Sequence, residues 1–74
     1  MTNWNYRIVK HKYPSGIFYE LHEVYYDGEA NIIGCTVKPQ AGSAESIDEL
    51  IEKLWKMARD AYKSRKDILD YEKM

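Results

Sequence analysis

The chain has little of what usually stabilises a domain of its size. Its 74 residues include one cysteine and two prolines. Because Cys35 stands alone, no disulfide can form within the chain. No Cys/His group has the spacing of a zinc site, so we expect neither a structural metal nor a cofactor. A chain this short buries only a modest part of its surface, so its stability must come from close packing or from oligomerisation.

An excess of charge of one sign is also missing. The 11 basic and 12 acidic residues give a net charge of −1, which provides no general attraction to nucleic acid or to an anionic membrane. No apolar run approaches the roughly 20 residues that a membrane-spanning helix needs. The first residues lack the basic and apolar segments of a signal peptide. We therefore expect a cytoplasmic protein with no membrane contact.

Aromatic residues are abundant, and seven of them are tyrosine. Tyrosine and tryptophan are rigid and amphipathic, and they are over-represented at protein interfaces. The composition therefore favours a protein partner, either a second copy of the chain or another small protein.

The first half of the chain is predicted to be β-structure. Residues 4–13, 17–26 and 32–38 are rich in aromatic and β-branched residues and read as three strands, with turns at 14–16 and from Asp27 onward. The third strand must end at Pro39, which has no backbone N–H to donate.

The second half is predicted to contain one helix. Ser46 and Glu49 have the spacing of a capping box, and apolar residues then recur at helical intervals over 47–63. The helix either ends near Ser64 or continues as a short C-terminal extension. We therefore expect a single α+β domain over 1–74, in which a three-stranded antiparallel meander is followed by one amphipathic helix packed on one face of the sheet.

The first turn predicts the register of the first two strands. Pro14 fixes φ near −65°, which excludes the type I′ and II′ hairpin loops. We expect a three-residue loop that pairs Tyr13 with Ile17. The remaining pairs would then be Lys10–Glu20, Val9–Leu21, Arg7–Glu23, Tyr6–Val24 and Trp4–Tyr26, of which two join opposite charges.

This register gives the sheet two partly apolar faces, and one helix covers only one of them. We assign the helix to the face with Trp4, Tyr6, Ile8, Phe18, Val24 and Tyr26, joined by Ile33, Cys35 and Val37. The second face can be covered by a partner, by the C-terminal segment with Ile68, Leu69 and Tyr71, or by water alone. Exposed apolar patches usually mark contacts. The candidate interaction face is formed by Val9, Ile17, Tyr19, Leu21 and Tyr25.

Few residues suggest catalysis. His11 and His22 are the two histidines, and a histidine near Cys35 would suit a nucleophile or half of a metal site. In mid-strand, however, a cysteine thiol behaves as a small hydrophobe. Glu20 and Glu23 are three residues apart on a strand and point to opposite faces. We predict no enzyme and no catalytic, cofactor-binding or metal-binding residue.

Basic residues provide an alternative. The run Lys63–Lys66, together with Lys10, His11, Lys12 and the aromatic side chains, could bind single-stranded nucleic acid by charge and stacking. Basic residues late in a helix are already explained by the helix dipole, and acidic residues flank the run.

Two segments resemble known proteins. The blocks WNYRIV (4–9) and HEVYYD (22–27), followed by Ile33-Gly34, resemble a group of small bacterial proteins of unassigned function, so the resemblance implies no site residue. More distantly, three strands, Gly34-Cys35 and the helix start at 46–50 resemble the partial RNase H-like module of HicB-type antitoxins, which bind a small toxin and dimerise. A longer segment precedes the helix here, and no DNA-binding domain follows it.

These observations predict a non-catalytic small protein-interaction module that forms a homodimer or another homo-oligomer. It would act as an antitoxin-like or phage-type inhibitor. The alternative is a single-stranded nucleic-acid-binding protein.

Overall fold

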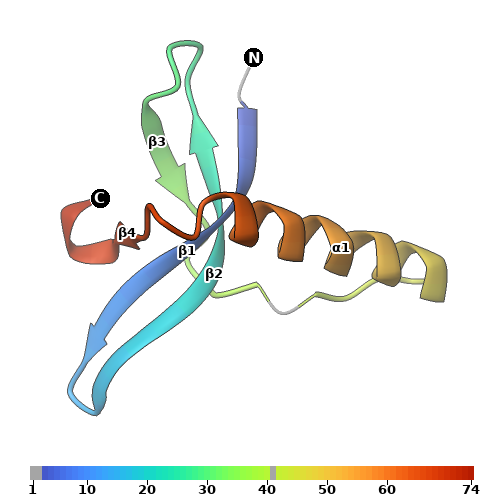
Figure 1. The fold of residues 1–74 in the computed structure, drawn as a ribbon, viewed down its shortest axis with the longest axis horizontal. Coiled ribbons are helices and arrows are strands. Elements are labelled where there is room, and N and C mark those ends of the chain that lie inside the picture. Colours follow the sequence, from blue (N-terminus) through green and yellow to red (C-terminus); the bar gives the residue numbers. More distant parts are fainter. Residues whose placement is uncertain (1–2, 41) are drawn as a thin grey trace.

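A computed structural model describes residues 3–40 and 42–74. In chain order its elements are β1 (Asn3–Tyr13), β2 (Gly16–Tyr26), β3 (Ile32–Cys35), α1 (Ile47–Lys63), β4 (Leu69–Asp70) and the 3-10 helix η1 (Tyr71–Lys73) (Figure 1). The α+β class is the one predicted, and α1 has the bounds expected from its capping box and apolar spacing.

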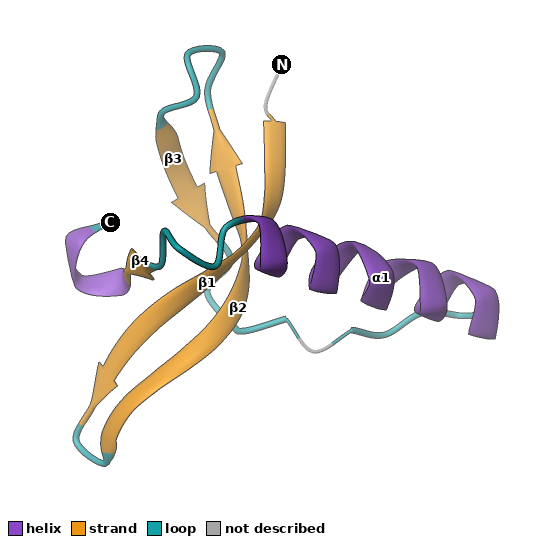
Figure 2. Ribbon diagram, viewed as in Figure 1, coloured by secondary structure: helices purple, strands orange, loops and turns teal. Residues whose placement is uncertain are grey.

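The sheet has one strand more than predicted. The strands β1, β2 and β3 form the expected antiparallel meander, but β4 adds a parallel partner to β1, so the strand order is β3-β2-β1-β4 (Figure 2). Of the two ends left open for the helix, the end near Ser64 is the one observed, because the segment after residue 63 forms a turn, β4 and η1. The third strand is also shorter than predicted: it ends at Cys35, and its ladder with β2 has an irregularity between Tyr25 and Tyr26, near the start of β3.

The turn between β1 and β2 differs from the prediction. Tyr13 pairs with Gly16, which leaves a two-residue loop of Pro14 and Ser15. Neither loop residue has a positive φ, whereas Gly16 has a φ of 134°. Pro14 excludes the type I′ and II′ turns, as expected, but a turn with two negative φ values closes an equally short loop when glycine follows. The predicted three-residue loop is wrong for this reason.

A shift of one residue turns every β2 side chain to the opposite face relative to β1. Val9 now faces Glu20, so the predicted Val9–Leu21 pair does not form. Other observed pairs are Trp4–Tyr25, Tyr6–Glu23, Arg7–His22, Ile8–Leu21 and Lys10–Tyr19.

The two predicted cross-strand ion pairs are replaced by contacts to the C-terminal segment. Arg7 Nη2 lies 3.2 Å from Asp67 Oδ2 and also donates to the Asp67 carbonyl oxygen at 2.7 Å. Lys10 Nζ lies 3.6 Å from Asp70 Oδ2. Basic residues of β1 therefore bind acidic residues that lie far later in the chain, which the sequence pattern around the hairpin does not indicate.

α1 packs on the face of the sheet that carries Trp4, Tyr6 and Ile8, as predicted. The Lys56 ammonium lies over the Trp4 ring, 4.5 Å from its centroid. The Tyr6 backbone N–H donates to Asp60 Oδ2 at 3.1 Å. The predicted membership of this face is partly wrong, because the observed register moves Phe18, Val24, Tyr26 and Cys35 to the other face and brings in Ile17, Tyr19, Leu21 and Tyr25.

The opposite face is covered by the C-terminal segment, one of the three covers that the sequence left open. Leu69 pairs with Val9 through β4, and the Tyr71 ring stacks on His11 with the centroids 4.5 Å apart. The segment lies within the bend of the β1–β2 ribbon (Figure 1). The buried residues on this face are Arg7, Val9, His11, His22 and Val24. The sheet therefore has a cover on each side, and its core on this side is largely polar.

The turn between β2 and β3 predicts a response to acid. The Asp27 carboxylate accepts hydrogen bonds from the backbone N–H groups of Asn31 at 2.9 Å and Glu29 at 2.8 Å. These bonds, that of Asn31 above all, hold the pKa of Asp27 below its ordinary value. A carboxyl whose folded pKa is lowered stabilises the fold above its unfolded pKa, and this contribution disappears as the pH falls through the folded pKa.

We therefore expect the amide proton shifts of Glu29 and Asn31, followed by NMR, to titrate together with a midpoint below the ordinary aspartate pKa. The same shifts should stay flat in Asp27→Asn. A midpoint at or above the ordinary aspartate value would contradict this role for the turn.

Candidate interaction surface

α1 begins and ends where its sequence predicts. The Ser46 hydroxyl oxygen accepts a hydrogen bond from the Glu49 backbone N–H at 3.2 Å, which caps the first turn. At the other end, the Ser64 backbone N–H donates to the Asp60 carbonyl oxygen at 3.2 Å. Acidic residues occupy the first turn and Lys63 the last, as the helix dipole favours. Local sequence alone therefore specifies this helix.

The side of α1 that faces the rest of the molecule is of mixed polarity. Its buried or half-buried residues are Leu50, Lys53, Lys56, Met57, Asp60, Ala61 and Ser64. Asp60 accepts from the Tyr6 backbone N–H, which β4 leaves without a strand partner because β4 pairs only with Val9 and Lys10. Since an N–H at a strand edge needs an acceptor, this contact turns the Asp60 side of the helix toward the sheet.

The main apolar side of α1 consequently points to solvent. We call it the α1 stripe, and it consists of Ile47, Ile51, Leu54, Trp55, Ala58 and Tyr62. Trp55 is 73% exposed and Tyr62 is 65% exposed. The prediction that these residues pack on the sheet is wrong; only Leu50, Met57 and Ala61 of the predicted apolar set lie on the inner side.

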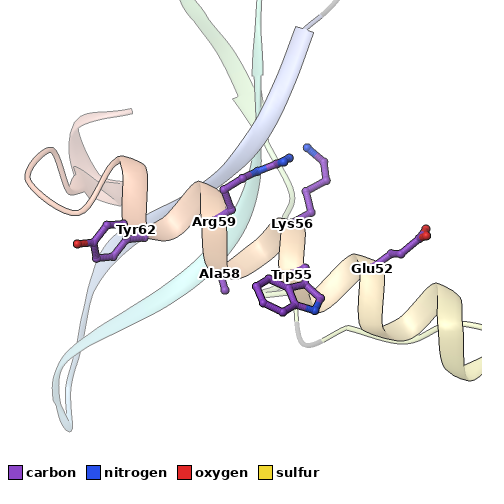
Figure 3. Close-up of a pocket in the computed structure, with 6 residues that line it drawn as sticks. All are labelled: Glu52, Trp55, Lys56, Ala58, Arg59 and Tyr62. Carbon is purple, nitrogen blue, oxygen red and sulfur yellow. The ribbon is translucent and has the colours of Figure 1, made fainter.

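A groove of about 660 Å³ runs along the stripe. It is lined by Glu52, Trp55, Lys56, Ala58, Arg59 and Tyr62 (Figure 3). All six residues belong to α1, so the groove lies along the surface of one helix. Sites for small molecules are usually enclosed by several elements that bury most of the ligand. The open shape of this groove therefore suits contact with another protein better than binding of a small molecule.

Charged residues follow one edge of the α1 stripe in two blocks. Asp48 and Glu52 lie in the N-terminal half of the helix, and Arg59 and Lys63 lie in the C-terminal half. Their spacing of whole helical turns places all four on the same edge. This edge is therefore negative at one end and positive at the other.

The predicted interaction face is divided by the observed register. Val9 is completely buried on the face with the C-terminal segment. Ile17 and Tyr19 are exposed near the end of the hairpin, and Leu21 and Tyr25 are half-buried on the α1 side of the sheet. Val9 is thus a core residue, while a binding role for the other four stays a prediction.

The structure brings together three titratable residues that sequence reasoning separated. Ligand atoms of His11, Glu20 and His22 all lie within 4.8 Å of one another. The predicted register placed the two histidines on opposite faces, whereas His11 pairs with Phe18 and His22 with Arg7, which puts both on one face. Cys35 instead pairs with Val24. The sequence feature that could have indicated this cluster is the presence of two histidines and a glutamate in the two strands of one hairpin.

Several of the residues expected to bind single-stranded nucleic acid in the alternative function make contacts within the chain instead. Lys10 pairs with Asp70, and His11 is buried. The Arg65 guanidinium lies 3.8 Å from the Tyr62 ring centroid and donates to the Tyr62 carbonyl oxygen at 2.8 Å. These contacts occupy groups that stacking and phosphate binding would need.

The division of the predicted face leads to a test by substitution. Val9→Ala should lower the free energy of unfolding by about 1.5–3 kcal/mol, because it removes fully buried methyl groups. Tyr19→Ala should change it by less than about 0.5 kcal/mol, since Tyr19 is 64% exposed. Urea unfolding followed by circular dichroism measures both. A neutral Val9→Ala would contradict the observed register.

Comparison of the chain with protein-family models, with curated proteins and with solved structures found no match. The resemblances to small bacterial proteins and to HicB-type modules therefore stay predictions. Among the described residues, no helix is both long enough and apolar enough to cross a membrane.

Proposed function

We propose that this chain is a non-catalytic protein-interaction module that forms a homodimer through the α1 stripe. The observation that carries the proposal is the stripe itself, a row of apolar side chains along the whole helix whose large members are 46–78% exposed. Small soluble proteins seldom expose such a row unless it contacts a partner. The sheet of the same chain cannot cover the stripe, because Asp60 and Lys56 hold the opposite side of α1 against β1.

The sizes of the stripe residues favour a second copy in antiparallel orientation. In a two-fold symmetric pair, each residue meets the residue at the same distance on the other side of the centre. With the centre between Leu54 and Trp55, Ile51 meets Ala58 and Ile47 meets Tyr62 of the second copy. A large side chain thus faces a small one near the middle, which allows the two helices to approach closely.

The charges favour the same arrangement. In an antiparallel pair, residues on one edge of the stripe meet residues on the corresponding edge of the second copy. Glu52 then lies near Arg59 of the second copy and Asp48 near its Lys63. The midpoint of both charge pairs lies one residue, about 1.5 Å along the axis, from the centre of the apolar pairs, an offset that long charged side chains can span. A parallel two-fold pair would instead place this edge against the opposite edge of the second copy's stripe, so neither charge pair would form. The antiparallel orientation therefore brings together apolar side chains of complementary size and residues of opposite charge.

The dimer predicts a clear effect of a buried charge. Leu54→Glu should abolish self-association, because it places two carboxylates at the centre of the interface. Tyr19→Glu, at an exposed apolar site on the hairpin, should leave it intact. Sedimentation equilibrium at about 10–200 µM distinguishes these results. A wild-type chain that stays monomeric over this range, or a dimer that is lost in Tyr19→Glu but kept in Leu54→Glu, would contradict the proposal.

The antiparallel orientation has its own test. Glu52→Arg should weaken the dimer about tenfold, because each copy then places a new guanidinium against Arg59 of the other. The double variant Glu52→Arg with Arg59→Glu exchanges the two charges and should restore the wild-type dissociation constant. If the double variant is as weak as Glu52→Arg alone, the two helices do not pair in this way.

A further inference from the structure

Two buried histidines face each other across the bend of the hairpin. His11 Nε2 lies 2.8 Å from His22 Nε2. His22 is completely buried and His11 nearly so. His11 is stacked against Tyr71 of the C-terminal segment and against Tyr13 of its own strand. Both rings are therefore held in place with their Nε2 atoms facing each other.

The hydrogen bonds fix which nitrogen of His22 is available. His22 Nδ1 lies 2.9 Å from the Thr36 carbonyl oxygen, which can only accept, so Nδ1 carries the proton. His22 Nε2 then has a free lone pair, directed at His11. An N–H donated to a backbone carbonyl is the usual way in which a metal-binding histidine is oriented.

Glu20 completes the group. Its side chain lies on the same face, and one of its oxygens lies within 4.8 Å of both the His11 and the His22 ligand atoms. The Tyr13 hydroxyl donates to Glu20 Oε1 at 2.7 Å, which holds the carboxylate in position. Two imidazole nitrogens and one oriented carboxylate oxygen are a donor set that suits zinc and similar divalent transition ions.

We propose that His11, Glu20 and His22 bind one divalent transition-metal ion of the zinc type. Metal–nitrogen bonds of about 2.0–2.1 Å at a tetrahedral angle require nitrogens about 3.3 Å apart, so the two rings need to separate by about 0.5 Å. His11 must also carry its proton on Nδ1, which frees Nε2. The ion replaces the hydrogen bond between the rings and joins β1 to β2 across the bend. The C-terminal segment, through Tyr71, covers the His11 side of the site.

Zinc titration of the full chain, prepared without a polyhistidine tag, tests the site. Isothermal calorimetry gives the affinity, and long-range ¹H–¹⁵N NMR identifies the ring nitrogens that bind. We expect one Zn²⁺ per chain, with shifts at Nε2 of both histidines and no response to Mg²⁺. Glu20→Gln should weaken binding at least about tenfold, and Tyr13→Phe, which keeps the stacked ring but loses the hydroxyl, by about 10–100-fold. Glu29→Gln, a remote exposed carboxylate, is the matched control.

The NMR spectrum of the unaltered chain needs no variant and so does not depend on whether a histidine variant folds. Shifts at both Nε2 atoms, together with a loss of affinity in Glu20→Gln and none in Glu29→Gln, would support the site. Unchanged histidine resonances at saturating Zn²⁺, or equal affinities of the wild type, Glu20→Gln and Tyr13→Phe, would overturn it. Dimerisation can fail its own test without affecting either result.

Discussion

The closure of the first hairpin at Tyr13 and Gly16 is the constraint on which the rest of the structure depends. It leaves Pro14 and Ser15 as the loop and assigns every later residue of β2 to a face. Because side chains alternate along a strand, a loop one residue longer would move every β2 side chain to the opposite face relative to β1. Val24 would leave the face that carries Val9, and His11 and His22 would point to opposite faces. The glycine that follows the loop, with its φ of 134°, makes this short closure possible.

Both covers of the sheet are held by polar contacts with neighbouring residues of β1. On one side Asp60 of α1 accepts from the Tyr6 backbone N–H, and on the other the Arg7 guanidinium binds Asp67. Buried polar groups require partners in a fixed geometry, so these contacts determine which side of each cover faces inward. For α1 the inward side is the one of mixed polarity that carries Asp60, and the apolar stripe is left for an external contact.

The sequence predicted local features better than their assembly. Ser46 and Glu49 cap α1 at the expected place, and the β-rich segments became strands, because these features depend on neighbouring residues. The orientation of α1 was not predictable in this way, since an apolar stripe shows which side of a helix avoids water but not what covers it. The histidine and glutamate group was missed because the cross-strand ion pairs Lys10–Glu20 and Arg7–Glu23 favoured the wrong register. The true partners of Lys10 and Arg7 come from the end of the chain, beyond the reach of any local pattern.

The contact between Arg7 and Asp67 gives the two covers of the sheet different sensitivities to salt. The Arg7 side chain is largely buried, but that of Asp67 is 85% exposed, so dissolved ions compete for the carboxylate. Higher ionic strength therefore loosens the C-terminal segment first, while hydrogen bonds within the hairpin are little affected. Tyr71, which covers the His11 ring, is thus held in place partly by the ion pair between Arg7 and Asp67, and this ion pair is weaker in concentrated salt than in dilute buffer.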